Sequence, residues 1–173
     1  MLVVMCGLPG SGKSTVAVEL SRVLRAVVVS VDPIEAAMLR AGVDSGQPTG
    51  LAAYVVAEAV AQGALESGLP VVVDAVNDAV EARAQWVGLG TRMAAPVRFV
   101  EVVCRDEAVH QARLAARGRR YAELPEPSWD SVVRRRAAFE RWRGQRLVVD
   151  GVRPVGEVVA ELVVGLSPTA DLG

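Results

Sequence analysis

Runs of apolar residues alternate with segments of helical periodicity along the whole chain of 173 residues. Five runs are rich in valine and almost continuously apolar, which is typical of strands that are buried on both faces. These runs cover Leu2–Cys6, Ala26–Val31, Leu69–Asp74, Val97–Cys104 and Arg146–Asp150. Strands that alternate with helices predict an α/β fold with a parallel sheet and helices on both of its faces.

The segments between these runs have apolar residues at the spacing of one helical face. The predicted helices cover a segment around 16–24, then Thr49–Glu66, a segment from Asp78 onward, Asp106–Arg117, Ser128–Arg143, and Pro154 to about Leu166. Asp78 and Glu81 resemble a capping pair at a helix start, and Ser128 is a typical N-cap residue. No long linker, repeat or low-complexity tract interrupts the pattern, which predicts one domain over residues 1–173.

A phosphate-binding motif follows the first predicted strand, at the edge where open parallel sheets bind their ligands. Gly7–Ser14 is GLPGSGKS and matches the pattern GxxxxGK[ST] at every fixed position. Its glycines let backbone N–H groups turn toward phosphate oxygens, and the next helix adds its positive N-terminal end. We expect Lys13 to reach the β- and γ-phosphates and the Ser14 hydroxyl to ligate Mg²⁺. The candidate nucleotide-binding residues here are Gly7, Pro9, Gly10, Ser11, Gly12, Lys13, Ser14 and Thr15.

Aspartates follow two further predicted strands. Asp74 ends an apolar run, so we expect it to hold Mg²⁺ directly or through water, although an aspartate here could also cap a helix. Asp32 follows the second run, where a carboxylate can accept a proton from a hydroxyl that attacks the γ-phosphate. The alternative role for Asp32 is to cap a helix that starts at Pro33.

The basic residues are distributed unevenly, with one lysine (Lys13) and eighteen arginines among the 19 basic residues. Residues 105–146 contain 11 basic and 6 acidic side chains, a net charge of +5, whereas the whole chain has a net charge of −1. We predict a short arginine-rich lid at about 113–128, in which Arg113 and Arg117 stabilise the transferring phosphoryl group and Arg120 binds phosphate.

The same segment has two other interpretations. Its arginines could form a solvated basic face paired with nearby glutamates, or they could contact nucleic acid, with Tyr121, Trp129 or Trp142 stacking on bases. The isoelectric point near 5.9 disfavours nucleic acid, because its binding domains are usually strongly basic. Arg153 lies in the loop after the fifth strand and is a candidate for contacts near the nucleotide base.

The remaining features favour an ordinary cytoplasmic protein. Cys6 and Cys104 fit no metal-binding spacing and lie in apolar runs, so we expect buried reduced thiols. The N-terminus has no signal-peptide pattern, and no uncharged apolar stretch is long enough to span a membrane. His110, in the middle of a predicted helix, is expected to be a surface or packing residue. Asn77 is either a helix cap or a contact to phosphate or substrate.

Taken together, the phosphate motif, Ser30-x-Asp32, the strand that ends at Asp74 and the late arginines resemble the small P-loop kinases. The most similar group is that of the polynucleotide-kinase-like and chloramphenicol-phosphotransferase-like enzymes. This resemblance implies a three-layer P-loop fold with a sheet of order 2-3-1-4-5, and ATP or GTP with Mg²⁺ as cofactors. It also implies transfer of the γ-phosphate to a hydroxyl group, with Asp32 as general base.

One departure from that group concerns the phosphate acceptor. Many relatives have an arginine in the first turn after the aspartate, where it can meet acceptor phosphates, but this chain has Pro33, Ile34 and Glu35 there. The departure favours an uncharged or cationic small molecule with a hydroxyl group. The alternative functions are a kinase for 5′-hydroxyl ends of nucleic acid, and a nucleotide-binding regulator or slow NTPase without an acceptor.

Overall fold

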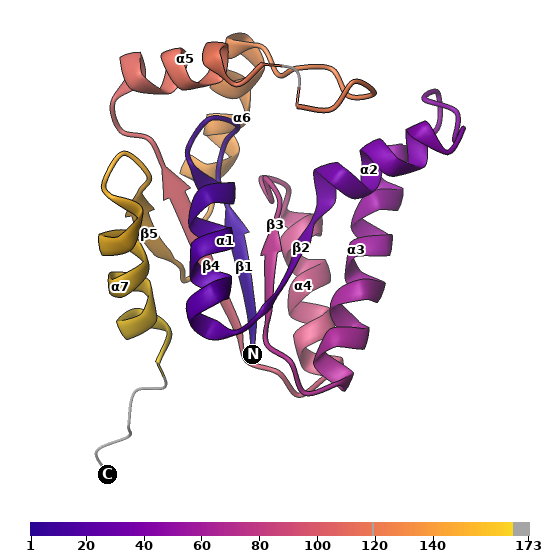
Figure 1. The fold of residues 1–173 in the computed structure, drawn as a ribbon, viewed down its shortest axis with the longest axis vertical. Coiled ribbons are helices and arrows are strands. Elements are labelled where there is room, and N and C mark those ends of the chain that lie inside the picture. The colour runs from indigo at the N-terminus through magenta and orange to yellow at the C-terminus, as the bar shows by residue number, and fades with distance from the viewer. Residues whose placement is uncertain (119, 168–173) are drawn as a thin grey trace.

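The computed structural model describes residues 1–118 and 120–167 and has a parallel sheet at its centre (Figure 1). Its strands are β1 (Leu2–Cys6), β2 (Val27–Ser30), β3 (Val71–Asp74), β4 (Val97–Val103) and β5 (Leu147–Asp150). They pair in the order β2-β3-β1-β4-β5, and every neighbouring pair is parallel. The α/β class and the expected strand order 2-3-1-4-5 are therefore confirmed.

Helices cover both faces of this sheet. They are α1 (Lys13–Leu24), α2 (Val31–Arg40), α3 (Thr49–Glu66), α4 (Val80–Arg92), α5 (Glu107–Ala116), α6 (Trp129–Arg141) and α7 (Val155–Leu166). Figure 1 shows α1 and α7 over one face, and α5 lying across the carboxyl ends of the strands. In the described residues, no helix is both long and apolar enough to cross a membrane.

Alternation along the central strand β1 produces two cores. Leu2 and Val4 pack on one side of the sheet in a cluster with Trp86 of α4. Val3 and Met5 pack on the other side in a cluster that includes residues of α1 and α7. Every residue of β1 is buried, as expected for a central strand of a sheet covered on both faces.

Two expectations about helix starts need correction. α4 begins at Val80 after the N-cap Ala79, which makes no side-chain cap hydrogen bond, so the predicted Asp78 cap is wrong. The Asp78 carboxylate instead pairs with Arg135 at 3.6 Å. α2 begins at Val31 after Ser30, which places Asp32 inside the first turn and excludes its role as the N-cap. The predicted Ser128 cap is confirmed, since its Oγ accepts a hydrogen bond of 3.2 Å from the Ser131 N–H.

Candidate active site

The loop between β1 and α1 has the backbone shape of a phosphate cradle. Gly7 has φ 145°, and a Cβ there would lie 2.4 Å from the Val102 carbonyl oxygen, so only glycine fits. Gly12 has φ 96° and is the N-cap of α1, but no side chain caps the helix in the described structure. The first N–H groups of α1 therefore have no cap partner from a side chain, which suits them to bind an anion.

Lys13 and Asp74 meet at the floor of the cradle. The Lys13 Nζ lies 2.6 Å from Asp74 Oδ1, and both side chains are about nine-tenths buried. Ser30 Oγ donates a hydrogen bond of 3.4 Å to Asp74 Oδ2. Burial opposes ionisation of Asp74, but the Lys13 charge and the hydrogen bonds from Lys13 and Ser14 outweigh it. They hold the Asp74 pKa below its usual value of 3.8.

This donor set fits a nucleotide with magnesium. Ser14 supplies a hydroxyl and Asp74 an ionised carboxylate, and Mg²⁺ prefers such oxygen ligands together with phosphate and water. Mg²⁺ keeps several waters when bound, so it requires few protein ligands. Ser14 and Asp74 would hold the ion, and Lys13 would then turn to the phosphates.

Asp32 lies at the opening of the cradle. A cavity of about 150 Å³ is lined by residues of the 8–15 loop together with Asp32, Arg117 and Arg120. The Asp32 carboxylate is 47% exposed, and its Oδ2 lies 3.7 Å from Arg117 Nη2. The structure therefore brings two predicted catalytic residues, Asp32 and Arg117, next to the phosphate loop.

A second cavity of about 440 Å³ adjoins the first and shares Pro9, Asp32 and Arg117 with it. Its other charged side chains are Glu35, Glu126 and Arg135, from α2, from the segment before α6, and from α6. Arg117 also lies 3.9 Å from Glu126, and the Arg135 guanidinium is paired with Asp78. The cavity walls come from distant parts of the chain, so the sequence alone predicted few of them.

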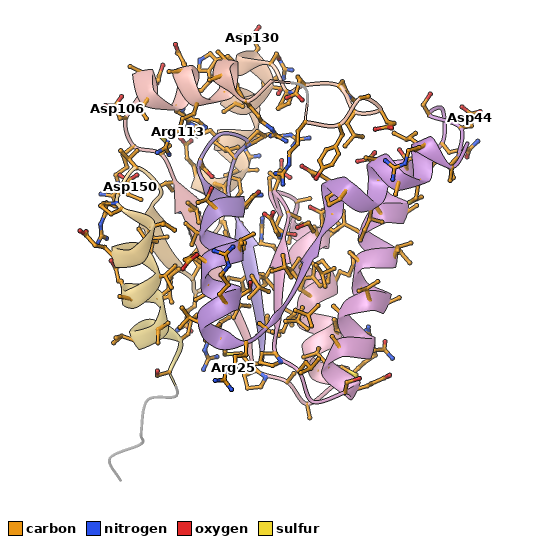
Figure 2. The ribbon with its side chains drawn as sticks, in the orientation of Figure 1. Arg25, Asp44, Asp106, Arg113, Asp130 and Asp150 are labelled. Atoms are coloured by element: carbon orange, nitrogen blue, oxygen red, sulfur yellow. The ribbon has the colours of Figure 1, made fainter. Side chains whose placement is uncertain are left out.

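Arg113 and Arg153 line neither of these two cavities. They line a third cavity of about 380 Å³ with Gly12, Thr15 and Gly151. Arg113 Nη1 donates a hydrogen bond of 2.9 Å to the Gly151 carbonyl, and Figure 2 shows Arg113 below α5, toward the loop that follows Asp150. Arg153 is half-exposed and pairs with Glu161 at 2.6 Å. The predicted lid arginine Arg113 is thus not in the cavity that holds Asp32.

His110 contacts the phosphate loop, which the sequence reasoning missed. Its side chain is 2% exposed, its Nε2 lies 2.8 Å from the Pro9 carbonyl oxygen, and its ring stands edge-on to Trp129. Because a carbonyl only accepts hydrogen bonds, Nε2 must be the protonated nitrogen. The available signal was helical spacing, since His110, Arg113 and Arg117 share one side of a helix.

Asn77 and the cysteines have structural roles. The Asn77 amide is fully buried, donates to the Met5 carbonyl at 2.7 Å and accepts from Trp86 Nε1 at 3.0 Å, so it neither caps α4 nor faces a ligand. Both cysteines are free. Burial raises the pKa of Cys6 to about 12. Cys104 is only partly buried, which differs from the expectation.

Several arginines of the basic segment face carboxylates of the same chain. Arg136 lies 3.6 Å from Glu107, and Arg146 lies 2.5 Å from Glu101. These pairs, with that of Arg135, support the paired basic face as the interpretation of this part of the segment. Arg119, which was included in the predicted lid, lies outside the described residues.

Fold and loop geometry together define a P-loop protein with a phosphate cradle. Residues 2–139 match the family described as the AAA domain, and the chain belongs to this family. A sequence search of curated proteins gives no match.

Solved structures with the same fold include several kinases. A candidate kinase from Chloroflexus aurantiacus superposes with a TM-score of 0.73 at 20% identity, over 96% of this chain and 98% of that one. Kti12 from Chaetomium thermophilum, in complex with ADP-AlF3, gives 0.69 at 21% identity, over 97% and 100%. A gluconokinase from Sinorhizobium meliloti gives 0.61 at 20% identity, over 95% and 90%. The fold is therefore one that P-loop kinases share, while the narrower polynucleotide-kinase-like and chloramphenicol-phosphotransferase-like group stays a prediction.

Proposed function

We propose that this protein is a Mg²⁺-dependent kinase that transfers the γ-phosphate of ATP or a related nucleoside triphosphate to a hydroxyl group of a small molecule. The observation that carries the proposal is the position of Asp32, whose carboxylate lines both the phosphate cavity and the adjoining larger cavity. A group at this junction can touch an acceptor and the phosphate that it attacks. The occurrence of the fold in a gluconokinase supports the assignment.

The transfer step assigns a task to each of these side chains. Asp32 takes the proton of the acceptor hydroxyl while the hydroxyl oxygen forms a bond to the γ-phosphorus. The bond between that phosphorus and the β–γ bridging oxygen breaks, and the nucleoside diphosphate leaves. Lys13, Arg117 and Arg120 offset the negative charge on the phosphoryl oxygens. Magnesium bound by Ser14 and Asp74 would neutralise charge on the β- and γ-phosphates.

Arg113 is better suited to nucleotide binding than to catalysis. Its guanidinium is held by the Gly151 carbonyl, on the other side of the P-loop from Asp32. We therefore assign Arg113, with Thr15 and Arg153, to the side of the site that receives the base and sugar. The segment 113–128 remains our candidate lid, with Arg117 as its arginine nearest to the proposed reaction centre.

The larger cavity favours an uncharged or cationic acceptor. The described residues that line it include three carboxylates, of Asp32, Glu35 and Glu126, and two guanidinium groups, both of which already face carboxylates. Glu35 accepts a hydrogen bond of 2.8 Å from the Thr49 hydroxyl, which fixes its carboxylate without neutralising it. Among the described residues, each arginine that lines this cavity already faces a carboxylate, which disfavours an acceptor that carries phosphate.

A screen of hydroxyl compounds tests the proposal. Neutral polyols, amino alcohols and phosphorylated sugars are incubated with the protein, ATP and Mg²⁺, and products are read by the mass of one added phosphoryl group. We expect products among the first two groups. Hydrolysis of ATP that no hydroxyl compound changes would instead support the slow NTPase. Salt-sensitive phosphorylation of a 5′-hydroxyl oligonucleotide, without small-molecule products, would support the nucleic-acid kinase.

A further inference from the structure

Helix α3 has an apolar outer face as well as an apolar inner face. Its inner residues Ala53, Ala57 and Ala61 are fully buried. On the opposite side, Leu51 is 66% exposed and Val55 is 57% exposed. Val56 and Val60, at the flank of the buried row, are 42% and 49% exposed. A helix that is apolar all round is normally buried on every side, so the outer face of α3 is expected to have a cover.

Charged groups are confined to the margins of this face. The 18 residues of α3 include only two charged side chains, Glu58 and Glu66. Glu58 is mostly buried and forms an ion pair with Arg92 of the neighbouring helix α4. Figure 1 shows α3 at the outer edge of the molecule, so the face is open to a partner. A partner with a strongly charged surface would gain no ionic contacts from the centre of this face.

One row of the face is complementary to itself. Leu51, Val55, Ala59 and Gly63 are exposed and follow each other at intervals of four, so they lie along one line of the helix. Side-chain size falls steadily along the row. If two copies of α3 pack antiparallel about a two-fold axis, Leu51 opposes Gly63 of the partner subunit and Val55 opposes Ala59 of the partner subunit. Each large side chain then meets a small one.

We propose that the outer face of α3 is the interface of a homodimer. The two-fold axis passes near the middle of the helix, as an isologous contact requires. A Cβ added at Gly63 would meet no atom of its own chain within 4 Å, so the space beside this glycine is available to a side chain of the other copy. The proposal is independent of the assigned kinase activity.

The size of the face agrees with a weak, reversible dimer. An 18-residue helix is about 27 Å long, and packing along its length covers roughly 400 Å² on each partner, below the ~800 Å² of a standard interface. Val43, before α3, and Leu69, after it, are also exposed and lie near the two ends of the helix in sequence. Antiparallel packing brings the Val43 end of one copy to the Leu69 end of the other.

Exposed apolar residues elsewhere provide matched controls. Val164 on α7 is 77% exposed and Val23 on α1 is 54% exposed, so both are as accessible as those of α3. Single exposed apolar residues are normal on protein surfaces. We therefore expect a charge at Val164 to leave association unchanged, whereas a charge at Val55 places two like charges close together at the centre of the proposed dimer.

Sedimentation of the full chain tests the dimer. Between about 1 and 100 µM, a range that suits an interface of this size, the wild type should shift from monomer to dimer. Val55→Arg should weaken association at least tenfold, and Val164→Arg should match the wild type. A wild type that stays monomeric throughout, or a Val55→Arg variant that dimerises normally, would overturn the proposal. Circular dichroism of each variant checks that the helices remain intact.

Exchanging the large and the small residue of one opposing pair tests the antiparallel register. Gly63→Leu should weaken the dimer because it opposes Leu51 of the partner subunit, although the monomer has room for it and leucine favours a helix. Leu51→Ala should weaken the dimer by opening a gap. The double variant restores one large and one small residue in each opposing pair, so it should associate more tightly than either single variant. Additive losses in the double variant would contradict this register.

Discussion

At the scale of single residues, the pair Lys13–Asp74 shows how the site handles charge. Each member has a second partner in the proposed reaction: Lys13 the phosphates, and Asp74 the metal. Two charges that are about nine-tenths buried need compensation, and each compensates the other at 2.6 Å. The pair therefore keeps both side chains charged and close to the positions in which they would act.

Protonation of Asp74 should lower the stability of the wild type at acid pH. Because the Asp74 pKa is lowered in the folded state, its ionised form stabilises the fold above the unfolded pKa of about 3.9. This contribution disappears as the pH falls through the folded pKa. Asp74→Asn should lower the free energy of unfolding by about 1–3 kcal/mol at pH 7, and the difference from wild type should shrink below about pH 4. Urea denaturation from pH 7 to 3 measures it. A difference that is constant with pH would refute the role of the charge.

His110 provides a second prediction at this scale. Replacement by leucine leaves the Pro9 carbonyl without its hydrogen bond, and we expect nucleotide affinity to fall about tenfold, equivalent to roughly 1.4 kcal/mol. Glutamine offers an N–H donor of similar reach and should restore most of the affinity. A titration with a fluorescent nucleotide compares the variants. Equal weakening by both would indicate a packing role for the ring instead of control of the loop through its N–H group.

At the scale of elements, α5 and the residues that follow it connect three parts of the site. His110 reaches the phosphate loop, Arg113 reaches the loop after β5, and Arg117 reaches Asp32. Their spacing places all three on one side of a helical path. A displacement of α5 would therefore affect three things together: binding of the nucleobase, binding of the phosphates, and the position of Asp32, the proposed general base.

Substitutions of Arg113 and Arg117 should separate nucleotide binding from phosphoryl transfer. Arg113→Ala should raise the nucleotide dissociation constant about tenfold with a smaller effect on the rate at saturation, because Arg113 lies on the side assigned to the nucleobase and sugar. Arg117→Ala should lower the saturated rate by about a hundredfold, because its charge faces the transferring group. Steady-state kinetics with varied ATP distinguishes them. A fall in the saturated rate for Arg113→Ala, with unchanged affinity, would return Arg113 to the catalytic role that the sequence suggested.

At the scale of the whole molecule, local sequence patterns predicted most of the framework. The valine-rich runs and the phosphate motif depend on neighbours in the chain, so the strands and the cradle around Lys13 were predictable. The strand order was implied by the resemblance to small P-loop kinases.

The features that were missed depend on contacts between distant segments. Asp78 was misread as a cap because its actual partner, Arg135, is far along the chain. Arg113 and Arg117 are similar in sequence context, and only the packing of α5 separates their cavities. The cavity that we propose for the acceptor combines α2, the segment before α6 and α6 itself, which no local pattern brings together. The single-domain assignment over 1–173 stays a prediction.

The most direct test of the central claim compares wild type with Asp32→Asn, measuring nucleotide affinity and phosphoryl transfer on the same samples. Asparagine keeps the shape of the side chain but cannot accept the hydroxyl proton. Because Asp32 is half-exposed and not part of the cradle floor, ATP affinity should change less than about threefold, while transfer to the acceptor falls by about 10²- to 10⁴-fold. Transfer at the wild-type rate by Asp32→Asn would contradict the assignment of the base, and with it the proposed mechanism.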